Sequence, residues 1–111
     1  MIEFDVTTTA DGIGVVVPRG RLNMVAARQL RETLTGLVEG GSTRIVVDLA
    51  ETTFLDSSAL GALVAGLKTA RQSGGDLRIA RPTESVMTVF RLTNLDTVLR
   101  PRDDVESAFD A

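Results

Sequence analysis

Three consecutive polar residues, Asp56, Ser57 and Ser58, are the part of this sequence best suited to chemistry. They follow a hydrophobic run at 45–49 and precede an amphipathic run at 60–70, so they fall where a loop becomes the first turn of a helix. An aspartate at the N-cap accepts hydrogen bonds from free N–H groups of the next turn. The two serines then lie at the positive end of the helix dipole, where an added phosphate is tolerated. The pattern favours a site for a reversible negative charge, with helix capping alone as the simpler interpretation of the same residues.

A catalytic serine is the main chemical alternative. The nucleophile elbow reads G-x-S-x-G, and the residues flanking Ser57 and Ser58 do not supply it. The sequence contains no histidine, so a Ser–His pair cannot form. Lys68, the only lysine, falls about three turns further along the same expected helix. We therefore expect no catalytic residues and predict that the chain is not an enzyme.

The composition fits one small globular domain, which we place at 1–111. Of 111 residues, 43% are hydrophobic and 24% are charged, enough for one two-layer core. The net charge is −3 and the basic residues are scattered, which argues against direct contact with nucleic acid. Without cysteine or histidine, disulfides and thiolate metal sites are excluded and the commonest zinc ligand is missing, so we expect no metal and no cofactor. No run approaches the length of a membrane span, and we expect a cytoplasmic protein without membrane contact.

Hydrophobic periodicity predicts five strands and four helices in the order ββαβαβαβα. Strands are expected at 2–6, 13–17, 44–49, 76–80 and 97–99, and helices at 24–39, from 57, from 84 and at 103–109. Pro18 should end the second strand because proline cannot donate to a ladder, and Asn23 should cap the first helix. Strands joined through helices favour parallel crossovers. We therefore predict a single α/β domain in which a mixed, mainly parallel sheet packs with about four helices.

Four motifs spread along the chain resemble the STAS domain family, and specifically its bacterial anti-sigma factor antagonists. They are the Gly20-x-Leu22-Asn23 turn, the strand Ile45-Val46-Val47-Asp48-Leu49, the segment Phe54-Leu55-Asp56-Ser57-Ser58-Ala59-Leu60-Gly61, and Ser73-Gly74-Gly75-Asp76-Leu77 followed by a helix ending Phe90-x-Leu92-Thr93-Asn94-Leu95. The aspartate with two serines, in this order of elements, is the most specific of the four.

The resemblance implies a partner switch. In the family, the serine directly after the motif aspartate, here Ser57, is phosphorylated by an anti-sigma factor that is also a serine protein kinase. The unmodified antagonist binds that anti-sigma factor and frees the sigma factor, phosphorylation blocks binding, and a PP2C-type phosphatase restores it. The partner-binding residues implied here are Asn23, Asp56, Ser57, Ser58, Ala59 and Gly61.

Two positions depart from the commoner family pattern. Ala59 replaces a usual glycine, so its methyl favours the helix and can hinder close approach by a kinase loop. Asn23 replaces a usual aspartate and removes a negative charge that we expect near Ser57. The alternative function is a STAS module in a signalling scaffold, or an accessory subunit of a membrane transporter.

Overall fold

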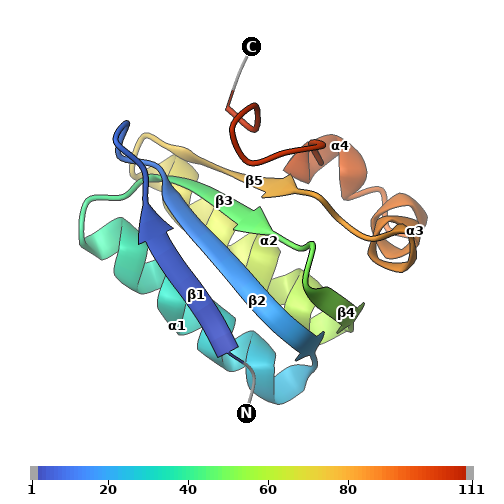
Figure 1. Cartoon of the computed structure of the whole chain (residues 1–111). Helices are drawn as coiled ribbons and strands as arrows, with labels where there is room; N and C mark the ends of the chain where they lie inside the picture. Colours follow the sequence, from blue (N-terminus) through green and yellow to red (C-terminus); the bar gives the residue numbers. More distant parts are fainter. Residues whose placement is uncertain (1–2, 110–111) are drawn as a thin grey trace.

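The computed structural model describes residues 3–109, which fold into a mixed five-stranded sheet with four helices (Figure 1). The elements in chain order are β1 (Glu3–Thr8), β2 (Gly14–Leu22), α1 (Met24–Glu39), β3 (Arg44–Asp48), β4 (Thr52–Leu55), α2 (Ser57–Gln72), β5 (Asp76–Ala80), α3 (Glu84–Leu92) and α4 (Asp96–Leu99). The predicted α/β class and the mixed, mainly parallel sheet are confirmed.

The sheet has the strand order β1-β2-β3-β5, and β4 pairs with β2 beyond the end of β3. β1 and β2 form an antiparallel hairpin, whereas the pairs β2–β3, β2–β4 and β3–β5 are parallel. β2 is therefore long enough to have two successive parallel neighbours. Its first residues pair with β3 and its last residues pair with β4.

The expectation that Pro18 ends the second strand is wrong. β2 continues to Leu22, and Pro18 lies opposite Phe4 of β1. The ladder with β3 ends at Val16 and the ladder with β4 begins at Gly20. Pro18 occupies the interval between the two partners, where its missing N–H removes no parallel ladder bond.

The main core lies between the sheet and α1, α2 and α3. Ile45 and Val47 of β3 belong to it, together with Leu30 of α1 and Leu63 of α2. The intervening Val46 points to the opposite face of the sheet, where it packs with Ala80 and Ala108. This alternation is the period of two that a strand with both faces covered requires.

Two local predictions are corrected in the second half of the chain. The fifth strand is at Thr52–Leu55 and not at 97–99, because Leu99 lies one helical turn after Leu95 and its N–H bonds to that carbonyl at 2.9 Å. The expected helix at 103–109 is instead a series of bends and turns. There Phe109 lies against the arginine side chains of Arg44 and Arg78, at 5.9 and 4.8 Å from its ring centre. The predicted first strand begins at residue 2, which lies outside the described residues.

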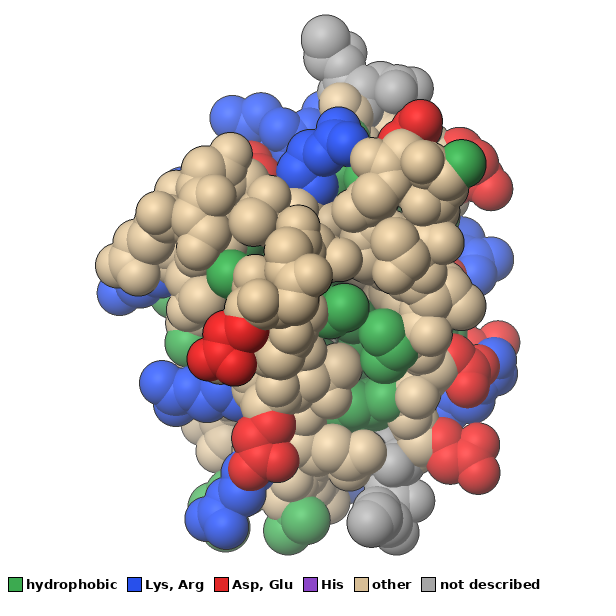
Figure 2. Space-filling view, turned by 90° about the vertical axis from the view of Figure 1, so that its left-hand side faces the viewer, with side chains coloured by type: hydrophobic (Ala, Val, Ile, Leu, Met, Phe, Trp, Pro, Cys, Tyr) green, Lys and Arg blue, Asp and Glu red, His purple; other side chains and the backbone are tan. Residues whose placement is uncertain are grey.

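The free edge of β1 is visible in Figure 2, where hydrophobic side chains lie in a hollow between the sheet and α1. Val6 is 44% exposed at this edge, and Phe4 and Leu37 are partly buried against the core. Within residues 3–109, no helix combines the length and the apolar character needed to cross a membrane.

Candidate partner-binding site

The candidate site is formed where two parallel strands end side by side. Arg21 and Leu22 at the end of β2 pair with Phe54 and Leu55 at the end of β4. The N–H of Asp56 donates to the carbonyl of Leu22 at 3.2 Å, so the backbone contact extends past the strands. A helix follows each strand, α1 after β2 and α2 after β4. The N-termini of both helices are thereby brought to one edge of the sheet.

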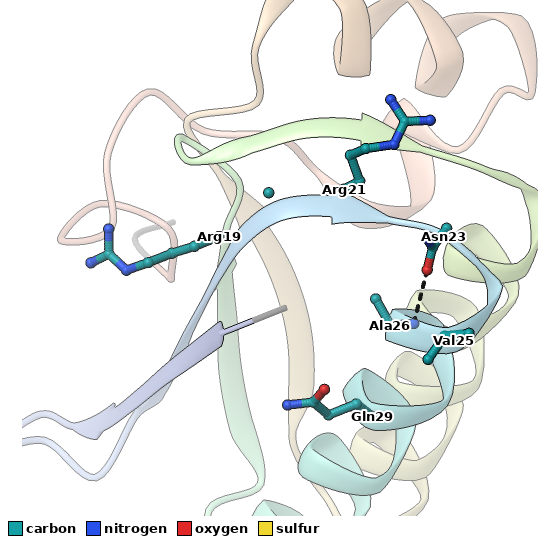
Figure 3. A pocket seen from close by; sticks show the side chains of 7 residues that line it. Arg19, Arg21, Asn23, Val25, Ala26 and Gln29 are labelled. Atoms are coloured by element: carbon teal, nitrogen blue, oxygen red, sulfur yellow. Dashed lines mark hydrogen bonds between the residues drawn. The ribbon is translucent and has the colours of Figure 1, made fainter. Parts of the chain in front are cut away.

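Each helix begins with a side-chain cap, as the sequence predicts. Asn23 Oδ1 accepts from the N–H of Ala26 at 3.1 Å, a bond drawn in Figure 3. Asp56 Oδ1 accepts from the N–H of Ala59 at 3.0 Å. The two caps occupy equivalent positions, one residue after the paired ends of β2 and β4. Only the cap of α2 carries a charge.

The two serines of the motif differ in their surroundings. Ser57 is the first residue of α2 and is exposed. Ser58 is partly buried and faces a groove of about 410 Å³ between α1 and α2. Gly61, which is exposed, lines the same groove. Ser57 is therefore the more accessible of the two hydroxyl groups.

Ala59 presents no side-chain surface in this structure, and its expected influence on a partner stays a prediction. Its exposed fraction is 0% and it belongs to the main core. Position 59 lies on the inward face of α2, in line with Ala62 and Leu63. The remaining residues expected to bind a partner lie around the two helix starts, where partner binding stays a prediction.

Sequence reasoning missed the apolar surface beside these caps. Met24 and Val25, the first two residues of α1, are 70% and 73% exposed. Phe54 of β4 is also exposed, and the guanidinium of Arg21 lies 4.2 Å from its ring centre. The available signal was that Val25 is out of register with the apolar stripe that includes Ala27 and continues along α1.

A second hollow, of about 360 Å³, lies between the end of β2 and the start of α1 (Figure 3). Gly20 in its wall has φ +108°, a conformation that favours glycine. The side chain of Arg19 is held by Asp5 through a 2.8 Å hydrogen bond, and this bond raises the pKa of Arg19 above its ordinary value. Gln29 and Ala26 also line this hollow.

One buried carboxylate lies near this edge, at the end of β3. Asp48 accepts from Arg81 Nε at 3.1 Å and from the N–H of Ala50 at 3.1 Å. The hydrogen bond with Asp48 raises the pKa of Arg81 above its ordinary value. Asp48 thus connects the ends of β3 and β5. Among residues 3–109, no cluster of three or more acidic, histidine or cysteine side chains is arranged to hold a metal ion.

Comparison with known proteins agrees with this architecture. The sequence model of the STAS domain family matches residues 6–108 of this chain. The chain belongs to the STAS domain family. An anti-sigma-B factor antagonist from Staphylococcus aureus is 29% identical over 100 residues, which cover 90% of this chain and 93% of that protein. These relatives are named as antagonists and not as enzymes, in agreement with the expectation for this STAS domain.

Solved structures share the fold over nearly the whole chain. An anti-sigma factor antagonist from Mycobacterium paratuberculosis is 25% identical with a TM-score of 0.84, covering 97% of this chain and 91% of that one. The Bacillus antagonist SpoIIAA in its unphosphorylated form is 22% identical with a TM-score of 0.84, covering 97% and 94%. SpoIIAA has also been solved in a phosphorylated form, which aligns with a TM-score of 0.76 at 21% identity and covers 97% of each chain.

Proposed function

We propose that this STAS domain is an anti-sigma factor antagonist that phosphorylation of Ser57 switches off. The observation that carries the proposal is the position of Ser57, an exposed serine at the first residue of a 16-residue helix, beside an exposed apolar surface. The relatives named as anti-sigma factor antagonists support the same assignment. The phosphorylated form of SpoIIAA supports a phosphate-controlled switch in a protein of this fold.

The partner in this proposal is an anti-sigma factor of the serine protein kinase type. The unmodified chain binds it and displaces the sigma factor, and a PP2C-type phosphatase removes the phosphate afterwards. Asn23, Asp56, Ser58 and Gly61 lie with Ser57 at the starts of α1 and α2 and belong to the contact surface in this proposal.

The geometry explains how one phosphate can release a partner without unfolding the domain. A phosphoserine adds a charge of about −1.5 to −2 at pH 7. The free N–H groups and dipole of a helix N-terminus tolerate such a charge. At an interface the same phosphate lies next to Asp56, and both charges must lose water together. Each 1.4 kcal/mol of that penalty weakens binding about tenfold.

The test combines phosphorylation with binding. The purified chain is incubated with ATP and with each kinase-type anti-sigma factor of the same cell, then analysed by intact mass and peptide mapping. We expect one phosphate, on Ser57, that is absent from Ser57→Ala and retained in the matched variant Ser58→Ala. Calorimetric titration should then give tight binding before phosphorylation and none after it.

Three other outcomes would revise the proposal. A phosphate on Ser58 alone would move the switch by one residue. Tight binding without any phosphate would make the chain a constitutive antagonist. Neither binding nor phosphate with any candidate would contradict the proposed function and favour a STAS module in a signalling scaffold.

A further inference from the structure

The first two turns of α1 present an unusual exposed face. Met24, Arg28 and Arg31 recur at the i, i+4, i+7 spacing, so they lie on one side of the helix, with Val25 beside them. All four are exposed, and the two apolar side chains are 70% and 73% exposed. We refer to these four residues as the α1 face.

The charge of this region is opposite to that of the whole chain. The α1 face carries Arg28 and Arg31 and no acid, a charge of +2 in a chain of net charge −3, and Glu32 directly follows it on the same helix. Asp56 is already engaged as the cap of α2. Within residues 3–109, neither Arg28 nor Arg31 has an acidic side chain within ion-pair distance.

The α1 face is continuous with the surroundings of the phosphorylation site. Met24, Arg28 and Arg31 form one wall of the groove between the helices, and Ser58 and Gly61 of α2 form the other. Ser57 immediately precedes Ser58 at the start of α2. A protein that covers Ser57 and enters this groove therefore meets the arginines and the methionine.

We propose that the α1 face docks an acidic segment of the anti-sigma factor that carries a hydrophobic side chain among its carboxylates. Arginine pairs with carboxylate through two parallel hydrogen bonds, which gives orientation as well as attraction. Methionine adapts its shape to an apolar partner side chain and loses exposed area on contact. This inference rests on the proposed function and specifies the chemistry of the partner at that site.

A nucleic-acid ligand fits this surface less well. Its phosphates would need a longer basic stripe than two adjacent arginines, and Met24 and Val25 would have no stacking partner because neither is aromatic. The mixture of two unpaired arginines with two exposed aliphatic side chains instead matches the composition of a protein interface.

The test compares single substitutions in titrations with the purified anti-sigma factor that the wild-type chain binds. Arg28→Glu should weaken binding about tenfold to a hundredfold and reduce its dependence on salt concentration. Met24→Ser should weaken binding about tenfold or more with little change in salt dependence. The matched control Lys68→Glu makes the same change of charge at an exposed residue of α2, three turns from Ser57, and should stay within about twofold of wild type.

Chemical-shift mapping of the isotopically labelled chain gives an independent readout. The amides of residues 24–31 should shift on titration together with those of residues 56–61. If Arg28→Glu and Met24→Ser bind like wild type, the inference is overturned while the proposed function stands. If the wild-type chain binds no anti-sigma factor, the proposed function fails and the inference fails with it.

Discussion

Asn23 and Asp56 perform the same backbone task with different charges. Each accepts one hydrogen bond from an N–H three residues later, at 3.1 and 3.0 Å. Asparagine and aspartate are about equally good N-caps. The charge of Asp56 is therefore not required for the helix, and we assign it to the environment of Ser57.

This assignment predicts different effects on stability for two substitutions of Asp56. Asp56→Asn should change the free energy of unfolding by less than about 0.5 kcal/mol, whereas Asp56→Ala should lower it by about 0.5–2 kcal/mol because the cap is lost. Urea denaturation of both variants measures this difference, with Asn23→Ala as the matched loss of the other cap. Equal destabilisation by Asn and Ala would show that the carboxylate charge itself stabilises the fold.

At the scale of residues, the sequence was sufficient for positions governed by local geometry. The caps at Asn23 and Asp56 and the first-turn position of Ser57 follow from residue type and neighbouring periodicity alone. The burial of Ala59 and the exposure of Met24 depend on which side of each helix meets the sheet. That orientation is set by tertiary packing, which a short motif does not encode.

The helices and strands also differ in how well the sequence alone predicts them. α1 and β5 have the predicted bounds because their patterns are long or are bounded by glycine. β4 and α4 have only four residues each, and at that length the partner decides the conformation. Thr52–Leu55 is a strand because the end of β2 lies beside it. Such pairing is not visible in the sequence of either strand alone.

The contacts of Phe54 and Phe109 with arginine predict losses of stability of different size for the two phenylalanines. Phe109→Ala should lower the free energy of unfolding by about 1–3 kcal/mol, because this partly buried ring packs on the sheet beside Ala108 and Arg78. Phe54→Ala should cost less than about 1 kcal/mol because the ring is exposed and contacts Arg21 from outside.

Binding to the anti-sigma factor should show the reverse order. Phe54→Ala should reduce affinity, whereas Phe109→Ala should not, because Phe109 lies with the second core cluster and away from the helix starts. Denaturation and calorimetric titration of both variants measure the two effects. If the same variant caused the larger loss of both stability and affinity, the binding site would not be separate from the packing that stabilises the fold.

At the scale of the molecule, the sheet is covered differently on its two faces. Helices α1 and α2 cover one face, and the segment after α4 covers part of the other through Ala108 and Phe109 (Figure 1). The candidate site lies at the helix starts, and the partly buried side chains around it contribute little to the main core. A change of charge there should leave the packed layers intact.

This arrangement predicts that adding a negative charge at Ser57 alters binding but leaves the fold unchanged. Ser57→Glu should retain the wild-type circular dichroism spectrum and raise the free energy of unfolding by about 0.3–1 kcal/mol, since an acid at a helix N-terminus is favourable. Ser57→Lys is the matched control and should lower it slightly. A loss of native circular dichroism in phospho-Ser57 or in Ser57→Glu would mean that the switch acts by unfolding.

Among residues 3–109, β4 and β5 each have a single strand neighbour, but β4 is the shorter strand and its pairing with β2 has a register irregularity between Gly20 and Arg21. Few backbone bonds must therefore break to release Thr52–Leu55, whereas release of β3 would separate β2 from β5. In terms of amide hydrogen exchange, we expect β4 to open at a lower free energy than β3, whose amides should exchange more slowly. We therefore expect the segment that leads into Ser57 to open locally while the sheet behind it stays closed.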